Sequence, residues 1–227
     1  DSVGMRLPFS RTKIERTLDE SLKRNQVSNA LIYLQVSRGV QFPRNHKFED
    51  NIDPTTLITV TEREIVDWEN IDPLNLTTKD DFRWGRGDIK VTSLIANVML
   101  RNEAVREGYD DAILIRDEKV TEATSANIFF VKGGVVITPK KSSFFLHGIT
   151  RETVLRLCEK IGLKTIERDV LKKEIYDADE VWLSSTGNEV RPVIKIDGES
   201  IGKNKALSNS VWRQLHEEYR KDTVSLA

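Results

Sequence analysis

The fold and function of this chain are best approached from one stretch of its sequence, Val120-Thr121-Glu122-Ala123-Thr124-Ser125-Ala126-Asn127-Ile128-Phe129. It carries one carboxylate, Glu122, among small residues, and it runs into a segment, 125–131, whose β-branched and aromatic residues predict a strand. A carboxylate in such surroundings can receive a cationic ring nitrogen. Taken alone, however, a solvated surface glutamate is the simpler interpretation.

About thirty residues upstream, Lys90 closes the segment Arg83-Trp84-Gly85-Arg86-Gly87-Asp88-Ile89-Lys90. Apolar residues at helical spacing predict a helix over 91–107 that ends at Gly108. A lysine at the start of a helix faces the positive end of the macrodipole, and this field favours the neutral amine that acts as a nucleophile. The alternative is an ordinary surface lysine.

Two downstream segments are suited to a phosphate. Gly148-Ile149-Thr150 opens a predicted helix over 151–161, so that free backbone N–H groups and a hydroxyl can face an anion. Ser184-Ser185-Thr186-Gly187-Asn188 follows a predicted buried strand over 181–184. In the simpler alternative, Thr150 is a helix N-cap and Thr186 a turn residue. Neither segment is a Walker loop, and no Gly-x-Gly-x-x-Gly fingerprint occurs.

In this order, together with Glu189-Val190-x-Pro192-Val193, the motifs resemble those of the fold-type IV pyridoxal-phosphate enzymes, the superfamily of branched-chain and D-amino acid aminotransferases. The resemblance runs from about Val3 to the C-terminus. It implies a two-lobe α/β fold of the α+β type, pyridoxal 5′-phosphate as cofactor, small-molecule amino acid and keto acid substrates, and a homodimer.

The resemblance also implies a role for each motif residue. Lys90 would bind the cofactor covalently and then move the proton between Cα and C4′. Glu122 would pair with the pyridinium nitrogen and keep the ring an electron sink. Arg83 would lie near the ring, with no role assigned. The remaining cofactor-binding residues would be Leu146 against the ring, and Ile149, Thr150, Ser185 and Thr186 at the phosphate.

The loop Gly39-Val40-Gln41-Phe42-Pro43-Arg44-Asn45-His46-Lys47-Phe48 is similar to the loop of D-amino acid aminotransferases that traps the substrate α-carboxylate. The guanidinium of Arg44 and the imidazole of His46 suit carboxylate recognition. The alternative is a solvated arginine beside a surface histidine. The loop favours a D-amino acid aminotransferase working by ping-pong transfer. Alternatives are a branched-chain aminotransferase, an aminodeoxychorismate lyase-like enzyme, or an inactive truncated form.

The chain begins Asp1-Ser2-Val3 and lacks the family's N-terminal His-x-x-Arg-Leu-type motif, whose arginine grips the phosphate. We therefore expect the small lobe to be incomplete and this chain alone to be incompetent in catalysis. The expected layout is a remainder of the small lobe over 1–65, a linker over 66–79, and a large cofactor-binding domain over 80–227.

Composition agrees with such an enzyme. The 227 residues carry 35 Lys plus Arg against 36 Asp plus Glu, a balance that gives no attraction to nucleic acid or an anionic membrane. One cysteine and three scattered histidines suggest no metal site. No stretch approaches the ~20 apolar residues of a membrane span. We expect a soluble, cytoplasmic protein.

The remaining pattern predicts alternating helices and strands. Thr12 and Glu15 have capping-box spacing at the start of a helix over 10–25. A largely buried strand is expected over 29–38, followed by a polar, irregular segment over 41–54. The other predicted elements are strands over 56–62, 111–116, 136–138 and 193–196, a hairpin turn over 132–135, and a helix over 209–220.

Overall fold

The computed structural model describes residues 2–5, 7–64, 71–202 and 210–224, and the chain divides into two compact units, Asp1–Asn70 and Ile71–Ala227. In the described segments, no helix is both long enough and apolar enough to cross a membrane.

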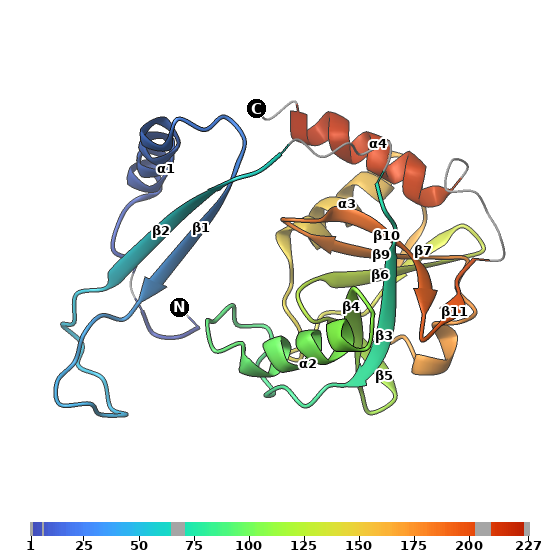
Figure 1. Cartoon of the computed structure of the whole chain (residues 1–227), viewed down its shortest axis with the longest axis horizontal. Helices are drawn as coiled ribbons and strands as arrows, with labels where there is room; N and C mark the ends of the chain where they lie inside the picture. Colours follow the sequence, from blue (N-terminus) through green and yellow to red (C-terminus); the bar gives the residue numbers. More distant parts are fainter. Residues whose placement is uncertain (1, 6, 65–70, 203–209, 225–227) are drawn as a thin grey trace. The chain divides into compact units, whose positions relative to one another are not determined.

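In its described residues, the first unit contains one helix and one β-ribbon (Figure 1). The helix α1 spans Arg11–Asn25, and β1 (Ala30–Ser37) pairs antiparallel with β2 (Thr55–Glu62). No helix or strand forms over 38–54. These elements agree with the predicted helix, strands and irregular segment.

Two expectations for this unit are wrong. The N-cap of α1 is Ser10, whose hydroxyl accepts from the backbone N–H of Lys13, and Glu15 instead pairs with Arg11 at 2.8 Å. The strand β1 is not largely buried, since Tyr33 and Leu34 are 47% and 37% exposed. A ribbon of two strands lacks the second packed layer that would bury both faces.

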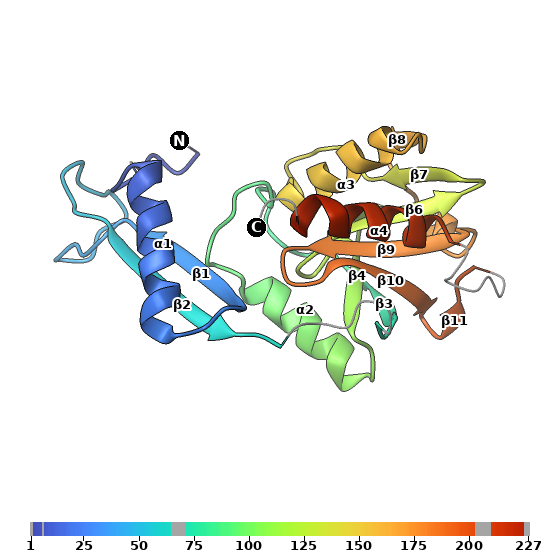
Figure 2. The same ribbon diagram turned by 90° about the horizontal axis from the view of Figure 1, so that it is seen from above.

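The second unit is built on a nine-stranded mixed sheet with the order β5-β4-β3-β10-β9-β6-β7-β8, in which β11 pairs with β10 (Figures 1 and 2). The strands β3, β4 and β10 run parallel to one another, and β7 runs parallel to β8. The strands are β3 (Leu74–Asp80), β4 (Asp111–Arg116), β5 (Lys119–Ala123), β6 (Asn127–Lys132), β7 (Val135–Thr138), β8 (Thr165–Glu167), β9 (Glu180–Ser185), β10 (Glu189–Ile196) and β11 (Glu199–Ser200).

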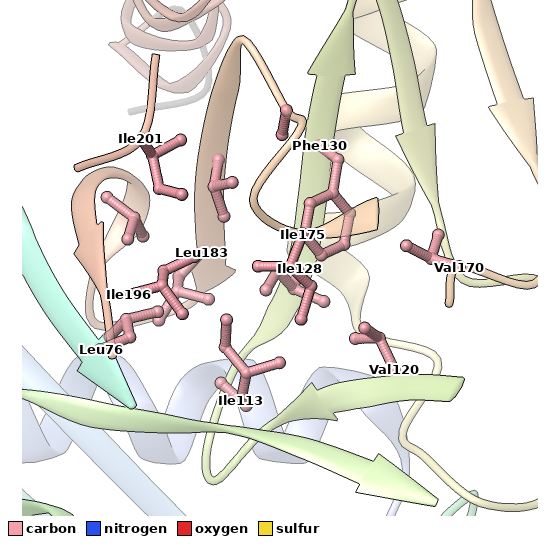
Figure 3. Packing of buried hydrophobic residues seen from close by; sticks show 14 of the residues in the cluster. Leu76, Ile113, Val120, Ile128, Phe130, Val170, Ile175, Leu183, Ile196 and Ile201 are labelled. Atoms are coloured by element: carbon pink, nitrogen blue, oxygen red, sulfur yellow. The ribbon is translucent and has the colours of Figure 1, made fainter. Parts of the chain in front are cut away.

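The helices of this unit are α2 (Ile95–Arg106), α3 (Ile149–Lys160) and α4 (Val211–Val224), with a 3₁₀ turn over Lys172–Glu174. Alternate residues of β6 serve different cores. Ile128 and Phe130 enter one cluster, shown in Figure 3, whereas Phe129 and Val131 enter the cluster that α3 and α4 cover. Burial on both faces explains the continuous apolar run of this strand.

The structure corrects two boundaries and adds one strand that the sequence did not predict. Residues 74–80 form β3, an interior strand of the sheet, so the linker predicted for 66–79 is wrong there, while 66–70 lie outside the described residues. The strand β5 was not predicted as an element. The strand predicted over 125–131 begins at Asn127, because Ala123 and Ala126 close a turn through a 2.8 Å backbone hydrogen bond.

The predicted helix over 91–107 begins only at Ile95. The apolar stripe that motivated it does not face the core: Ile95 is 76% exposed, and Val98 and Met99 are also exposed. The buried positions of α2 are Leu100 and Ala104, which pack on β4. These apolar residues do recur at helical spacing, but they lie on the exposed face of α2.

Candidate active site

Glu122 lies on β5 and is 7% exposed. Its Oε1 accepts from Nη1 of Arg83 at 2.5 Å. Burial raises the pKa of Glu122 from 4.5 to about 7, against the opposing charge and hydrogen bond of Arg83. The alternative of a solvated surface glutamate is therefore wrong, because this carboxylate is buried and its pKa lies near 7.

Asp81 holds the other edge of the Arg83 guanidinium. Both Nε and Nη2 donate to its two carboxylate oxygens at 2.9 Å, so that only Nη1 reaches Glu122. Thr121 and Arg116 also donate to Asp81. Burial alone would raise the pKa of Asp81, but hydrogen bonding and charge from Arg83, with Thr121 and Arg116, hold this pKa below its usual value. Sequence reasoning placed Arg83 nearby and missed its function as the partner of Glu122.

Asn127, the first residue of β6, connects Glu122 to the next segment. Its Nδ2 donates to Oε2 of Glu122 at 3.3 Å and to the carbonyl of Leu146 at 2.7 Å. Its Oδ1 accepts from the backbone N–H of Gly148 at 3.2 Å. A Cβ at Gly148 would lie 2.3 Å from this Oδ1, so any other residue there would displace the Asn127 side chain. The motif contained Asn127, but no sequence signal gave it a role.

Gly148 is the N-cap of α3, and Ile149 and Thr150 form its first turn. The alternative in which Thr150 is the N-cap is therefore wrong. No side chain caps this helix end, so its first N–H groups remain available for an anion. Arg151, fully buried, anchors the same turn by donating to the carbonyl of Pro139 and to Glu167 on β8.

The second predicted phosphate segment lies at the same end of the sheet. Ser184 is paired with Asn127 across β9 and β6, which places Ser185, the last residue of β9, next to the start of β6. Ser185 is half-buried and Thr186 is exposed in the turn that follows. Hydrogen bonds of Asn127 thus connect Glu122, Leu146 and the start of α3, which carries Ile149 and Thr150. Strand register places Ser185, which Thr186 follows, beside them.

Lys90 lies in an irregular segment between β3 and α2 and is exposed. Because α2 begins at Ile95, the argument that Lys90 faces a helix N-terminus is wrong. The loop is nevertheless held against the Leu146 loop: a Cβ at Gly87 would lie 2.4 Å from the carbonyl oxygen of Phe144. The N–H of Asp88 also bonds the carbonyl of Ser143 at 3.3 Å.

Arg44 and His46 lie in the other unit, on the irregular segment between β1 and β2, and both are exposed. Gln41 braces this loop by donating to the carbonyl of Lys47 at 3.0 Å and accepting from the N–H of Glu49 at 3.3 Å. Their action on a carboxylate stays a prediction, as do the roles of the other motif residues. Within the described ranges, no group of three or more His, Cys, Asp or Glu is placed to hold a metal.

The chain is similar to proteins of known activity. The profile of the family described as amino-transferase class IV matches residues 1–196. A D-alanine aminotransferase of Bacillus licheniformis is 40% identical over 224 residues, which are 98% of this chain and 79% of that protein. A D-alanine aminotransferase of Listeria innocua is 33% identical, with coverage of 98% and 77%.

Among solved structures, a T.th. branched-chain amino acid aminotransferase with pyridoxamine 5′-phosphate has a TM-score of 0.84 and 28% identity. The match covers 96% of this chain and 72% of that chain. A buried carboxylate, a helix N-terminus that no side chain caps, and a family profile across most of the chain agree with one another. This chain therefore belongs to the class IV aminotransferases, the fold-type IV enzymes that depend on pyridoxal 5′-phosphate.

Proposed function

We propose that this protein transfers the amino group of a D-amino acid to an α-keto acid, in two successive half-reactions. The observation that carries the D-amino acid assignment is the Pro43-Arg44-x-His46-x-Phe48 loop, which suits capture of a substrate α-carboxylate. The 40% identity with a D-alanine aminotransferase supports it.

The cofactor would supply an electron sink for the negative charge left when a proton departs from the substrate Cα. The residues present fit this group. Glu122 offers a buried carboxylate whose Oε2 accepts from Asn127 at a long 3.3 Å, so the oxygen retains capacity for a protonated ring nitrogen. The open N–H groups of Ile149 and Thr150 suit a phosphate.

The positions of these residues suggest a separate role for each of them. Glu122, whose ionised form is favoured by the charge and hydrogen bond of Arg83, would hold a proton on the ring nitrogen. Asp81 would keep Arg83 oriented so that a single N–H meets Glu122. Lys90 would hold the cofactor and afterwards act as the base and acid that moves the Cα proton, for which an exposed amine on a loop has the necessary freedom. Arg44 and His46 would orient the substrate through its carboxylate.

A branched-chain aminotransferase is the second candidate, and one observation favours it: the TM-score of 0.84 with the T.th. enzyme of that activity. An aminodeoxychorismate lyase-like activity is the third. Half-reactions with D-alanine, L-leucine and aminodeoxychorismate, followed by the absorbance of the cofactor, separate the three. Faster conversion with D-alanine supports the proposal, and faster conversion with either other substrate overturns it.

We also propose that the protein acts as a homodimer in the cytoplasm. Support for association comes from α2, where Ile95, Val98 and Met99 expose apolar surface on one side of the helix. Light scattering after size exclusion measures the mass directly. A monomer at micromolar concentration would contradict the dimer.

A further inference from the structure

Asn127 is a buried amide, 5% exposed, whose position in the fold is fixed independently of the site. It begins β6, where Ile128 and Phe129 are fully buried on opposite faces. The strand pairs with β9 on one side and with β7 on the other. The Cα of Asn127 is therefore held by an interior strand, and its side chain projects from a rigid base.

The three hydrogen bonds of this amide go to three different parts of the proposed cofactor site. Glu122 would meet the ring nitrogen, Leu146 would pack on the ring, and Gly148 begins the helix that would receive the phosphate. We propose that Asn127 is a positioning residue that fixes the ring-nitrogen carboxylate and the phosphate-binding helix end relative to each other. The inference rests on the proposed function.

The chemistry of the partners requires an amide at this position. Nδ2 donates to a carboxylate and a carbonyl, while Oδ1 accepts from an N–H. An aspartate would keep the acceptor for Gly148 but place a second carboxylate against Glu122. Leucine has a similar shape and provides neither donor nor acceptor. The 2.3 Å approach at Gly148 shows that the two residues are fitted to each other.

Because the Asn127 side chain contacts both ends of the site, a substitution that disturbs the ring end should also change binding of the phosphate. Asn127→Leu should weaken binding of pyridoxal phosphate about tenfold or more and shift the ³¹P resonance of the bound phosphate, since a buried hydrogen bond to a charged group is lost. Asn127→Asp keeps the acceptor for Gly148 but places a carboxylate against Glu122. It should therefore weaken binding of pyridoxal, which lacks the phosphate, by a similar factor, and shift the ³¹P resonance of bound pyridoxal phosphate less than Asn127→Leu does.

Asn97 on α2 provides the matched control. Its Nδ2 donates to the carbonyl of Thr124 at 2.7 Å, and not to a residue of the proposed cofactor site. Asn97→Leu should lower the melting temperature without moving the ³¹P resonance, and any loss of cofactor affinity should be smaller than for Asn127→Leu. Equal affinities and ³¹P shifts in the two leucine variants would overturn the inference.

A second measurement needs no variant of Asn127, in case those variants do not fold. In the protein without cofactor, Glu122→Gln replaces one acceptor of the Asn127 amide by a donor, which should disturb the contact with Gly148. We expect binding of inorganic phosphate, measured by ³¹P line broadening, to weaken severalfold. Unchanged phosphate binding contradicts the coupling. If the wild-type protein develops no cofactor absorbance with pyridoxal phosphate, the proposed function fails instead.

Discussion

The raised pKa of Glu122 predicts that this residue destabilises the protein without cofactor at neutral and alkaline pH. Its pKa is about 7 in the fold and 4.5 ordinarily. Between these values the unfolded chain has already lost the proton that the folded chain retains, so stability falls as pH rises through this window. The linkage relation gives a loss of ~2–3 kcal/mol between about pH 5 and about pH 8.

Glu122→Gln should remove this loss, because glutamine does not ionise. Its amide can still accept from Arg83, but its NH₂ group would face Nδ2 of Asn127, a pH-independent cost of ~1 kcal/mol. The difference in unfolding free energy between variant and wild type should therefore move in favour of the variant by ~2–3 kcal/mol from about pH 5 to about pH 8.

Urea unfolding of the cofactor-free proteins at the two pH values measures this difference, and the pH-independent cost cancels. Glu174 is a suitable control, because the hydrogen bond from Arg168, although opposed by partial burial, lowers the pKa of Glu174. Glu174→Gln should then change the pH dependence in the opposite direction, at more acidic pH. Parallel stability curves for wild type and Glu122→Gln would refute the reasoning.

Three further predictions concern other parts of the site. Borohydride reduction of the cofactor-loaded protein, followed by peptide mapping, should place the pyridoxyl group on Lys90, and a label on any other lysine would contradict that role. Arg44→Ala should weaken D-amino acid binding by ~2–5 kcal/mol if the pair is buried in the complex, but affect amines without a carboxylate far less; equal losses would show a structural role. Gly148→Ala should lower both melting temperature and cofactor affinity, because its Cβ would meet Asn127 at 2.3 Å, whereas Gly85→Ala, with open space around it, should change neither.

The sequence predicted structure correctly where neighbouring residues alone determine the backbone conformation. The hairpin at 132–135 follows from two glycines, and both adopt positive φ. The α/β class and the order of most elements follow from hydrophobic periodicity. The prediction failed where tertiary context decides, as with β3, whose polar residues 77–80 gave no strand signal although the segment lies inside the sheet.

The site shows the same division. The spaced motifs singled out Glu122 and the segment Gly148-Ile149-Thr150, because each belongs to a recognisable pattern, although α3 begins at Ile149 and not at the predicted Arg151. The ion pair of Arg83 with Glu122 joins residues thirty-nine positions apart, and no local pattern encodes such pairing. The start of α2 was misplaced because apolar spacing alone does not distinguish an inner face from an outer one.

The placement of β6 between two cores has a consequence for motion. Displacing this strand would disturb the packing around Ile128 on one face and around Phe129 on the other, so its amide protons should exchange with solvent only on global unfolding. We therefore expect movement near the proposed site to arise in irregular segments such as 81–94 and 139–148, which carry Lys90 and Leu146. Catalytic turnover would thus combine a rigid strand, β6, which holds Asn127 in place, with irregular segments that can change conformation.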